Sequence, residues 1–230
     1  MKTIGLIGGL SWESSAEYYR IINREMQRRL GGTHSAKILM YSFDFGEIEE
    51  LQAGGKWDDA RDQMIAVGKR LAAGGADFLV ICSNTMHRMA DAVEWQSRLP
   101  LLHIADPTGE KIRQAKLKRI ALLGTAYTME QDFYKGRLKD KYGLEITIPN
   151  EDERALIHRV IYEELTRGQA KEASRAAFRK IMERLASEGA QGIILGCTEI
   201  MMLVKPEDCA APLFDTTTLH ALAAVDLALA

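Results

Sequence analysis

The sequence predicts an α/β protein built from two similar halves, each a short parallel sheet flanked by helices. Short apolar runs alternate with amphipathic stretches along the whole chain, which is typical of buried strands covered by helices on both faces. Segments of the first half also recur in the second half, in the same order and at a nearly constant offset. We expect the first half to comprise residues 1–103 with 215–230, and the second half residues 104–214.

Eight apolar runs have the length and composition of strands. They are residues 3–7, 36–43, 78–81, 101–104, 119–123, 144–148, 192–195 and 212–214. Five intervening stretches carry apolar residues at helical spacing and predict helices. They are residues 13–30, 57–73, 129–141, 153–167 and 172–188.

Composition and charge exclude several function classes. The 230 residues include 30 Lys and Arg and 32 Asp and Glu, and the net charge of -2 gives no electrostatic case for nucleic acid or anionic lipid. No apolar run approaches the roughly 20 residues of a membrane span, and the segment MKTIGLIGGL is too short and Gly-rich for a signal peptide. The three cysteines suggest neither a disulfide framework nor a zinc site. We expect a cytoplasmic protein with reduced thiols.

Three internal matches define the repeat. The segment KTIGLIG at residues 2–8 aligns with KRIALLG at 118–124, and GADFLVICS at 75–83 aligns with GAQGIILGC at 189–197. A shorter match pairs PLL at 100–102 with PLF at 212–214. Any two strand–turn–helix segments look alike, but three matches in order are hard to obtain by chance. We therefore interpret the halves as homologous units.

The second match places Ser83 and Cys197 at equivalent positions, each where a buried strand ends in small polar residues. Ligands of open parallel sheets bind beyond the carboxyl ends of the strands. If the halves face each other about a pseudo-twofold axis, these two residues lie on opposite walls of one cleft. The neighbouring Cys82 would point to the other face of its strand and pack into the core.

Cys197 is the strongest catalytic candidate, because a helix starting after it would favour the thiolate. A buried cysteine often only fills space, but the glycine before it and its polar twin favour a function. The hydroxyl of Ser83 is a much weaker acid. It could transfer a proton directly, cap the strand end or bind a carboxylate.

Further candidates for substrate binding surround these two positions. Asn84, Thr85 and Thr198, with the amides beside them, could form two anion-binding nests or ordinary helix caps. Glu199 could bind an ammonium group, assist Cys197 or act as a first-turn acid.

The loops after the first strand of each half contribute Leu10 and Ser11 in one half and Thr125 and Tyr127 in the other. The glycine pair before Leu10 allows close approach of a ligand, whereas neither nucleotide-binding glycine motif is present. Gln52 lies in a Gly-flanked stretch, residues 51–55, that we expect to be a mobile loop over the cleft. His87 reads more as a structural hydrogen bonder than as a site residue.

Five segments together resemble the aspartate/glutamate racemase family, and the likeness covers essentially the whole chain. They are GLIGGLSWESSAEYY, CSNTMH, ALLGTAYTMEQDFY, IYEELTRG and GAQGIILGCTEI. The chain is most similar to the enterobacterial branch of broad-specificity or L-aspartate/glutamate-specific amino-acid racemases. This resemblance implies two pseudo-symmetric Rossmann-like α/β domains with the active site in the cleft between them, a homodimer, and proton transfer at the substrate α-carbon without a cofactor.

In the family, two cysteines face the α-carbon from opposite sides, one removing the proton and the other returning one. By resemblance, Cys197 is the second of these and position 83 is the first, where this chain has serine. The enterobacterial branch is similar in having a hydroxyl residue here, which implies an adapted site. A further departure is FDFGEIEELQ at residues 43–52, where some aspartate racemases have an Asp-Arg pair for the substrate.

These observations predict a cofactor-independent racemase acting on a small acidic or polar amino acid, with no metal and no nucleic-acid or membrane partner. Cys197 and Ser83 would exchange protons with opposite faces of the α-carbon. One alternative is a one-thiol decarboxylase or isomerase of small dicarboxylates, which needs no second thiol. Another is an amino-acid-binding protein that uses the same cleft without catalysis.

Overall fold

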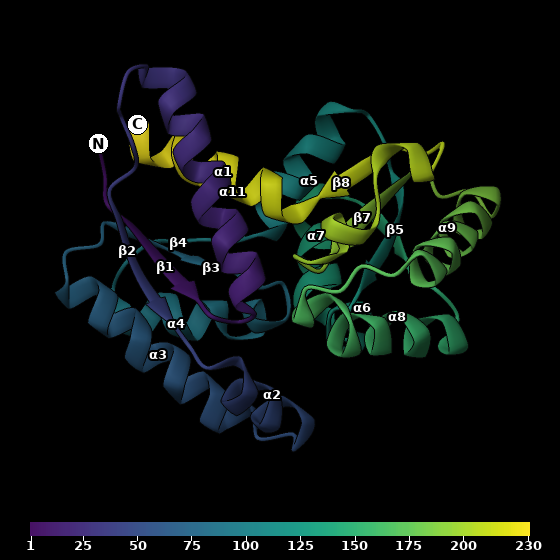
Figure 1. The fold of residues 1–230 in the computed structure, drawn as a ribbon, viewed down its shortest axis with the longest axis horizontal. Coiled ribbons are helices and arrows are strands. Elements are labelled where there is room, and N and C mark those ends of the chain that lie inside the picture. Colours follow the sequence, from purple (N-terminus) through teal and green to yellow (C-terminus); the bar gives the residue numbers. More distant parts are fainter. The chain divides into compact units, whose positions relative to one another are not determined.

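Eight strands form two four-stranded parallel sheets in the computed structural model, which describes residues 1–230 (Figure 1). The first sheet has the order β2-β1-β3-β4 and the second the order β6-β5-β7-β8. The strands of the first sheet are β1 (Ile4–Gly8), β2 (Ile38–Ser42), β3 (Phe78–Ile81) and β4 (Leu101–Leu102). Those of the second are β5 (Arg119–Gly124), β6 (Glu145–Thr147), β7 (Gly192–Gly196) and β8 (Leu213–Asp215). The α/β class with parallel sheets is confirmed, and all eight predicted strands are present.

The chain divides into two units around these sheets. Unit 1 comprises Met1–Ile104 and His220–Ala230, and unit 2 comprises Ala105–Leu219. The chain therefore leaves unit 1 once and returns to it within the last helix, α11 (Thr216–Leu229).

Helices cover both faces of the sheet in unit 1 (Figure 1). One core joins β1 and β3 to α1 (Trp12–Leu30) and to the end of α11. The opposite core joins the same strands to three helices, α2 (Phe45–Ala53), α3 (Trp57–Ala73) and α4 (Ala90–Ser97). Alternate residues of β1 point to opposite cores, as parallel strands buried on both sides require: Leu6 lies in the first and Ile7 in the second.

Unit 2 repeats this plan with its own helices. They are α5 (Ala105–Gln114), α6 (Ala126–Glu130), α7 (Asp132–Tyr142), α8 (Glu151–Glu163), α9 (Glu172–Ser187) and α10 (Ile200–Leu203). Helix α8 packs on β5 and α9 packs on α8, whereas α5 contacts α7 and β8. A capping box between Asn150 and Glu153 fixes the start of α8. Short 3-10 turns cover Leu165–Arg167 and Pro206–Asp208.

Several helices differ from the sequence-based expectation. The stretch at residues 51–55, expected as a mobile loop, is mostly helical, since α2 extends to Ala53 and buries Gln52. Helices α4, α5, α10 and α11 were also absent from the prediction: α4 and α10 are short and α11 is apolar on most sides, whereas α5 was missed although its buried residues follow helical spacing. None of the helices combines the length and apolar character that a bilayer crossing requires.

Strand register shows which positions of the two units are equivalent. In unit 1, Ile7 of β1 pairs with Ile81 of β3, and Ser83 follows two residues later. In unit 2, Leu123 of β5 pairs with Leu195 of β7, and Cys197 follows two residues later. The two sheets share one strand order, so Ser83 and Cys197 occupy the same topological position of their respective units.

Candidate active site

Ser83 lies just beyond the carboxyl end of β3, with only 8% of its surface exposed. The chain turns there into a 3-10 helix, Thr85–Met89, and the Ser83 Oγ accepts a hydrogen bond from the Met86 N–H at 3.4 Å. Asn84 and Thr85 are buried beside it. The hydroxyl therefore acts as the cap of a tight turn, one of the three roles left open for it, and its own proton stays free to be donated elsewhere.

The loop after β1 is held next to this turn. Gly9 has a φ of 72° and a side chain there would overlap the backbone of Phe43, so only glycine fits. The Gly9 N–H donates to Ser15 Oγ at 2.8 Å, and Ser14 Oγ donates to the Cys82 carbonyl oxygen at 3.3 Å. These bonds tie the start of α1 to the end of β3.

Ser11 is the most unusual residue of this loop. Its φ of 134° is rare for a residue with a side chain, and its buried Oγ has no hydrogen-bond partner. Buried hydroxyls are normally satisfied, and strained backbone tends to occur where a ligand binds. Leu10, by contrast, packs in the core with Met86 and so supports the loop.

Two other residues near Ser83 have structural positions. The Gln52 amide nitrogen lies 3.1 Å from Met86 Sδ, so α2 contacts the turn that carries Ser83. Cys82 is fully buried in the core between β3, α1 and α11, and burial raises the pKa of its thiol. This agrees with the expectation that Cys82 only packs.

Cys197 lies at the end of β7 in unit 2, 7% exposed, and its thiol donates a hydrogen bond to Glu199 Oε2 at 3.0 Å. The Thr198 hydroxyl donates to the same oxygen at 2.7 Å. The other oxygen of this buried carboxyl, Oε1, has no partner. Cys197, Thr198 and Glu199 thus form one hydrogen-bonded group, in which Glu199 Oε1 is an unused acceptor.

The electrostatics of this group differ from the expectation. Burial, and after it the negative charge and hydrogen bond of Glu199, raise the pKa of the Cys197 thiol well above its usual value. The backbone N–H groups of Thr198 and Glu199 act in the opposite direction but more weakly. The raised thiol pKa is opposite to the lowered thiol pKa that we expected at a helix start; α10 is a single turn that begins only at Ile200. The resting sulfur is a thiol paired with a carboxylate.

The residues after β5 lie beside this group, because Gly124 and Gly196 are register partners in neighbouring strands. Thr125 caps α6 by accepting from the Thr128 N–H at 3.2 Å. Tyr127 packs edge-on against His158 from α8, with ring centroids 5.6 Å apart. His158 was not predicted from the sequence, yet its Nδ1 accepts from the Ala126 N–H at 3.1 Å. No motif surrounds it, so only the fold reveals it.

Each unit therefore gathers its own candidates at the carboxyl edge of its sheet. Unit 1 holds Ser83 and five further candidates, which are Leu10, Ser11, Gln52, Asn84 and Thr85. Unit 2 holds Cys197 and four further candidates, which are Thr125, Tyr127, Thr198 and Glu199. No group of three or more His, Cys, Asp or Glu side chains is placed to hold a metal ion.

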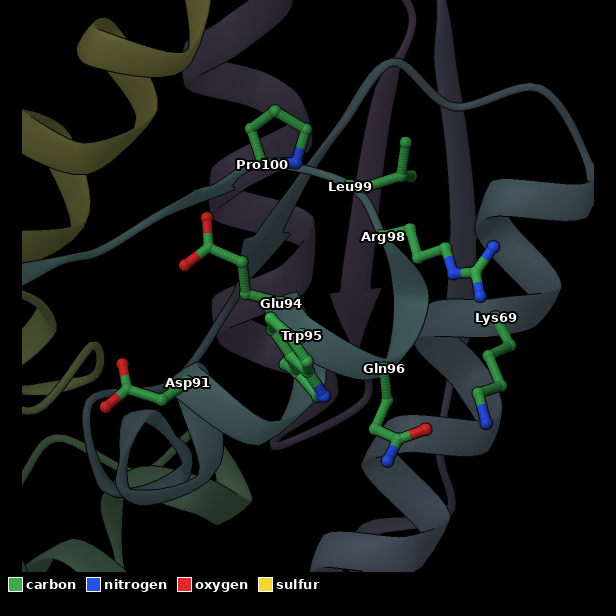
Figure 2. Close-up of a pocket in the computed structure, with 8 residues that line it drawn as sticks. All are labelled: Lys69, Asp91, Glu94, Trp95, Gln96, Arg98, Leu99 and Pro100. Atoms are coloured by element: carbon green, nitrogen blue, oxygen red, sulfur yellow. The ribbon is translucent and has the colours of Figure 1, made fainter.

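A surface hollow of about 1020 Å³ lies away from these residues, beside the start of β4 (Figure 2). Asp91 and Glu94 lie on one side of the exposed Trp95, and Lys69 and Arg98 lie on the other. The hollow is at the amino edge of the sheet, whereas ligands of parallel sheets bind at the carboxyl edge. We do not assign it to the candidate active site.

Comparison with known proteins gives consistent relatives. The Asp/Glu/hydantoin racemase family matches residues 7–224. A candidate Asp/Glu racemase from Yersinia pestis is 51% identical, with all of both chains covered and a TM-score of 0.92. An aspartate racemase homologue from Pyrococcus horikoshii is 33% identical, again over all of both chains, with a TM-score of 0.83. The broad-specificity amino-acid racemase RacX of Bacillus subtilis is 23% identical over 173 residues, covering 75% of this chain and 74% of its own.

Proposed function

Because the chain belongs to the Asp/Glu/hydantoin racemase family, we propose that it is an amino-acid racemase that works without a cofactor. In this proposal one group removes the proton from the substrate α-carbon and another returns a proton to the opposite face. Cys197 serves one face and Ser83 the other. The substrate is a small acidic or polar amino acid.

The equivalence of Ser83 and Cys197 carries the proposal. Each residue follows, by two positions, a strand residue that pairs with the first strand of its unit, and the two sheets have the same strand order. Each is buried at the carboxyl edge of its sheet. A reaction with two faces of attack needs two proton-handling groups, and a duplicated fold provides them at matching positions. This position carries the hydroxyl of Ser83 in unit 1 and the thiol of Cys197 in unit 2.

Two orphaned polar atoms support a polar ligand at these edges. Ser11 Oγ and Glu199 Oε1 are both buried without a partner. An unmatched buried polar group costs about 1–3 kcal/mol, which a bound amino acid would recover. Ser11 Oγ suits a carboxylate as donor, and Glu199 Oε1 suits the α-ammonium as acceptor.

The pairing with Glu199 gives Cys197 a route to the thiolate. The thiol proton passes along its existing 3.0 Å hydrogen bond to Glu199, which leaves a thiolate and a neutral carboxylic acid. The thiolate then takes the α-proton of the substrate and becomes a thiol again, and Glu199 releases its proton to solvent, which balances the proton that water supplies on the other face. This assigns Glu199 the role of assisting Cys197, among the roles left open for it.

The other face relies on the Ser83 hydroxyl. It gives its proton to the α-carbanion, and the alkoxide that forms is stabilised by the Met86 N–H that already points at Oγ. A proton from water then restores the hydroxyl. Since serine is a far weaker acid than cysteine, we expect the two enantiomers to differ in the rate of α-proton exchange and in kcat, whereas kcat/KM for racemisation must be equal because the equilibrium constant is 1.

Deuterium exchange tests the proposal. The protein is incubated in deuterated water with each enantiomer of a panel of amino acids, and α-deuterium and optical rotation are followed. We expect incorporation with inversion for at least one acidic or polar amino acid. If neither enantiomer of any member exchanges, the racemase proposal fails.

The presence of only one thiol at the two equivalent positions favours a second candidate, a one-thiol decarboxylase or isomerase of small dicarboxylates. Cys197 would then act on one face, and Ser83 would bind a carboxylate. Turnover of malonate-type or maleate-type compounds without amino-acid exchange would support this candidate. The family resemblance further leads us to propose a homodimer in the cytoplasm, which sedimentation analysis and cell fractionation can check.

A further inference from the structure

The geometry points to His87 as a positioning residue that aims the hydroxyl of Ser83, an inference that rests on the proposed function. The ring binds the backbone on both sides. Its Nδ1 lies 2.6 Å from the Ser83 carbonyl oxygen, and its Nε2 lies 3.1 Å from the Ile104 nitrogen.

These two contacts fix the protonation of the ring. The Ile104 N–H can only donate, so Nε2 must be the acceptor and carries no proton. The remaining proton sits on Nδ1 and is donated to the Ser83 carbonyl. His87 is therefore neutral, as the Nδ1–H tautomer, and joins residue 83 to the segment after β4.

The ring is held in this orientation by its neighbours. His87 packs against His103 and His220, with ring centroids 4.6 Å and 5.5 Å away. His220 is itself fixed, since Tyr18 lies 2.8 Å from Nδ1 and the Leu102 carbonyl 2.8 Å from Nε2. All of these side chains are buried, so His87 cannot swing away from Ser83 without opening the core.

The turn from Ser83 to His87 is closed at three points. Ser83 Oγ accepts from the Met86 N–H, and the His87 backbone N–H donates to the Asn84 carbonyl. The His87 ring donates from Nδ1 to the Ser83 carbonyl. Because the carbonyl and the side chain of Ser83 share one Cα, fixing the carbonyl also fixes the direction of the Cα–Cβ bond. The hydroxyl is thereby aimed.

Unit 2 does without this device. The offset of 114 residues that relates Ser83 to Cys197 places Met201 at the position of His87 and Glu199 at that of Thr85. The thiol is assisted by a carboxylate bonded directly to it, whereas the hydroxyl is assisted by backbone groups that must be held in place. The effect of His87 should therefore be confined to the face served by Ser83.

A pair of amide variants tests this. His87→Asn places its NH2 near the position of Nδ1 and can still donate to the Ser83 carbonyl, whereas His87→Gln places its amide near Nε2. Ser83→Ala identifies which enantiomer depends on the hydroxyl. His87→Asn is therefore the matched control for His87→Gln, because it changes the same buried ring and keeps a donor near the position of Nδ1.

Deuterium exchange is measured for both enantiomers, with circular dichroism and melting to confirm folding. We expect His87→Gln to lose at least about tenfold in exchange of the Ser83-dependent enantiomer, mainly in kcat, while exchange of the other enantiomer changes little. His87→Asn should recover much of that loss. Equal loss for both enantiomers, or His87→Gln at least as active as His87→Asn, would overturn the positioning role.

A second measurement does not depend on activity. Nitrogen-15 NMR of the histidine rings should report His87 as the neutral Nδ1–H tautomer, and an Nε2–H or doubly protonated ring would overturn the assignment. If the unmodified protein exchanges neither enantiomer, the proposed function fails. If it exchanges and the His87 pair shows no selectivity, only the positioning role fails.

Discussion

Cys197 and Glu199 form a buried thiol–carboxylate pair in which Sγ donates to Oε2 across 3.0 Å. Burial and the carboxylate both raise the pKa of the thiol, so the sulfur holds its proton more tightly in the free protein. Reactivity toward an external reagent and reactivity toward a bound substrate are therefore different properties of this cysteine, because alkylation proceeds through the thiolate, which the raised pKa disfavours in the free protein.

Alkylation should consequently follow exposure and pKa. With iodoacetamide near neutral pH, Cys209, which is partly exposed, should react before the buried Cys82 and Cys197. Glu199→Gln removes the charge that raises the pKa of Cys197 and should speed its alkylation. Peptide mass mapping over time measures all three thiols. Faster reaction of Cys197 than of Cys209 in the unmodified protein would contradict the pairing.

The same Glu199→Gln variant should exchange α-deuterium more slowly, by on the order of 100-fold, because the amide cannot accept the thiol proton. Because unfolding would also expose the buried thiol and slow exchange, the variant is compared with the unmodified protein under conditions where both are fully folded. Exchange rates in deuterated water, at equal melting temperature, provide the measurement. An unchanged exchange rate would remove Glu199 from the proton route.

Substitution of the two equivalent residues should have unequal effects. Cys197→Ala should abolish exchange, since it deletes the thiol, whereas Ser83→Cys supplies a stronger acid and should raise racemisation or extend it to the slower enantiomer. Polarimetry with each enantiomer follows both variants. Unchanged rates in both would exclude these residues from the mechanism.

Two glycines of equal backbone geometry allow a test of the Gly9 loop. Gly9 and Gly55 have φ values of 72° and 66°, but a Cβ at Gly9 would overlap Phe43, whereas nothing lies within 4 Å at Gly55. Gly55→Ala should cost about 1–2 kcal/mol in unfolding free energy from the left-handed backbone alone. Gly9→Ala should cost a further ~1–3 kcal/mol for the forced overlap. Urea titration compares them, and equal losses would show that the loop has room to adjust.

Acid should weaken unit 2 through Asp106. Although burial raises its pKa, hydrogen bonds from Arg137 and Lys141 lower the pKa to about 2. Because the folded pKa lies below the unfolded value of about 3.9, the stability it gives is full above that value and is lost as the pH falls toward 2. Asp106→Asn should cost about 1–2 kcal/mol at pH 7 and flatten this acid dependence. Denaturation at several pH values tests it, with Asp140→Asn as control, because Asp140 is exposed and lies on α7, the helix that carries Arg137 and Lys141.

The fold could be predicted because buried parallel strands are short apolar runs, and the repeat located their order. Helix α11 escaped prediction because its sequence, TTTLHALAAVDLAL, is apolar on most sides and shows no stripe. Gln52 was misplaced because its flanking glycines suggested a loop, whereas Gly54 only ends α2.

The site was predictable in its positions but not in its contacts. The repeat located Ser83 and Cys197, yet their partners depend on tertiary structure. His158 contacts Ala126 from 32 residues away, and His87 contacts Ile104 from 17 residues away, with no motif joining them. The high pKa of Cys197 likewise depends on burial, which spacing alone does not report.

The division of the chain also determines the order in which its parts can be completed during synthesis. Unit 2 is one continuous segment, whereas unit 1 is completed by residues His220–Ala230, which follow unit 2 in the chain. Those residues cover one face of the first sheet, and the Lys2 N–H bonds to the Ala228 carbonyl at 2.8 Å. Unit 1 is thus begun before unit 2 and completed after it. One apolar face of its sheet stays uncovered while unit 2 is made, and during that time it is open to other proteins.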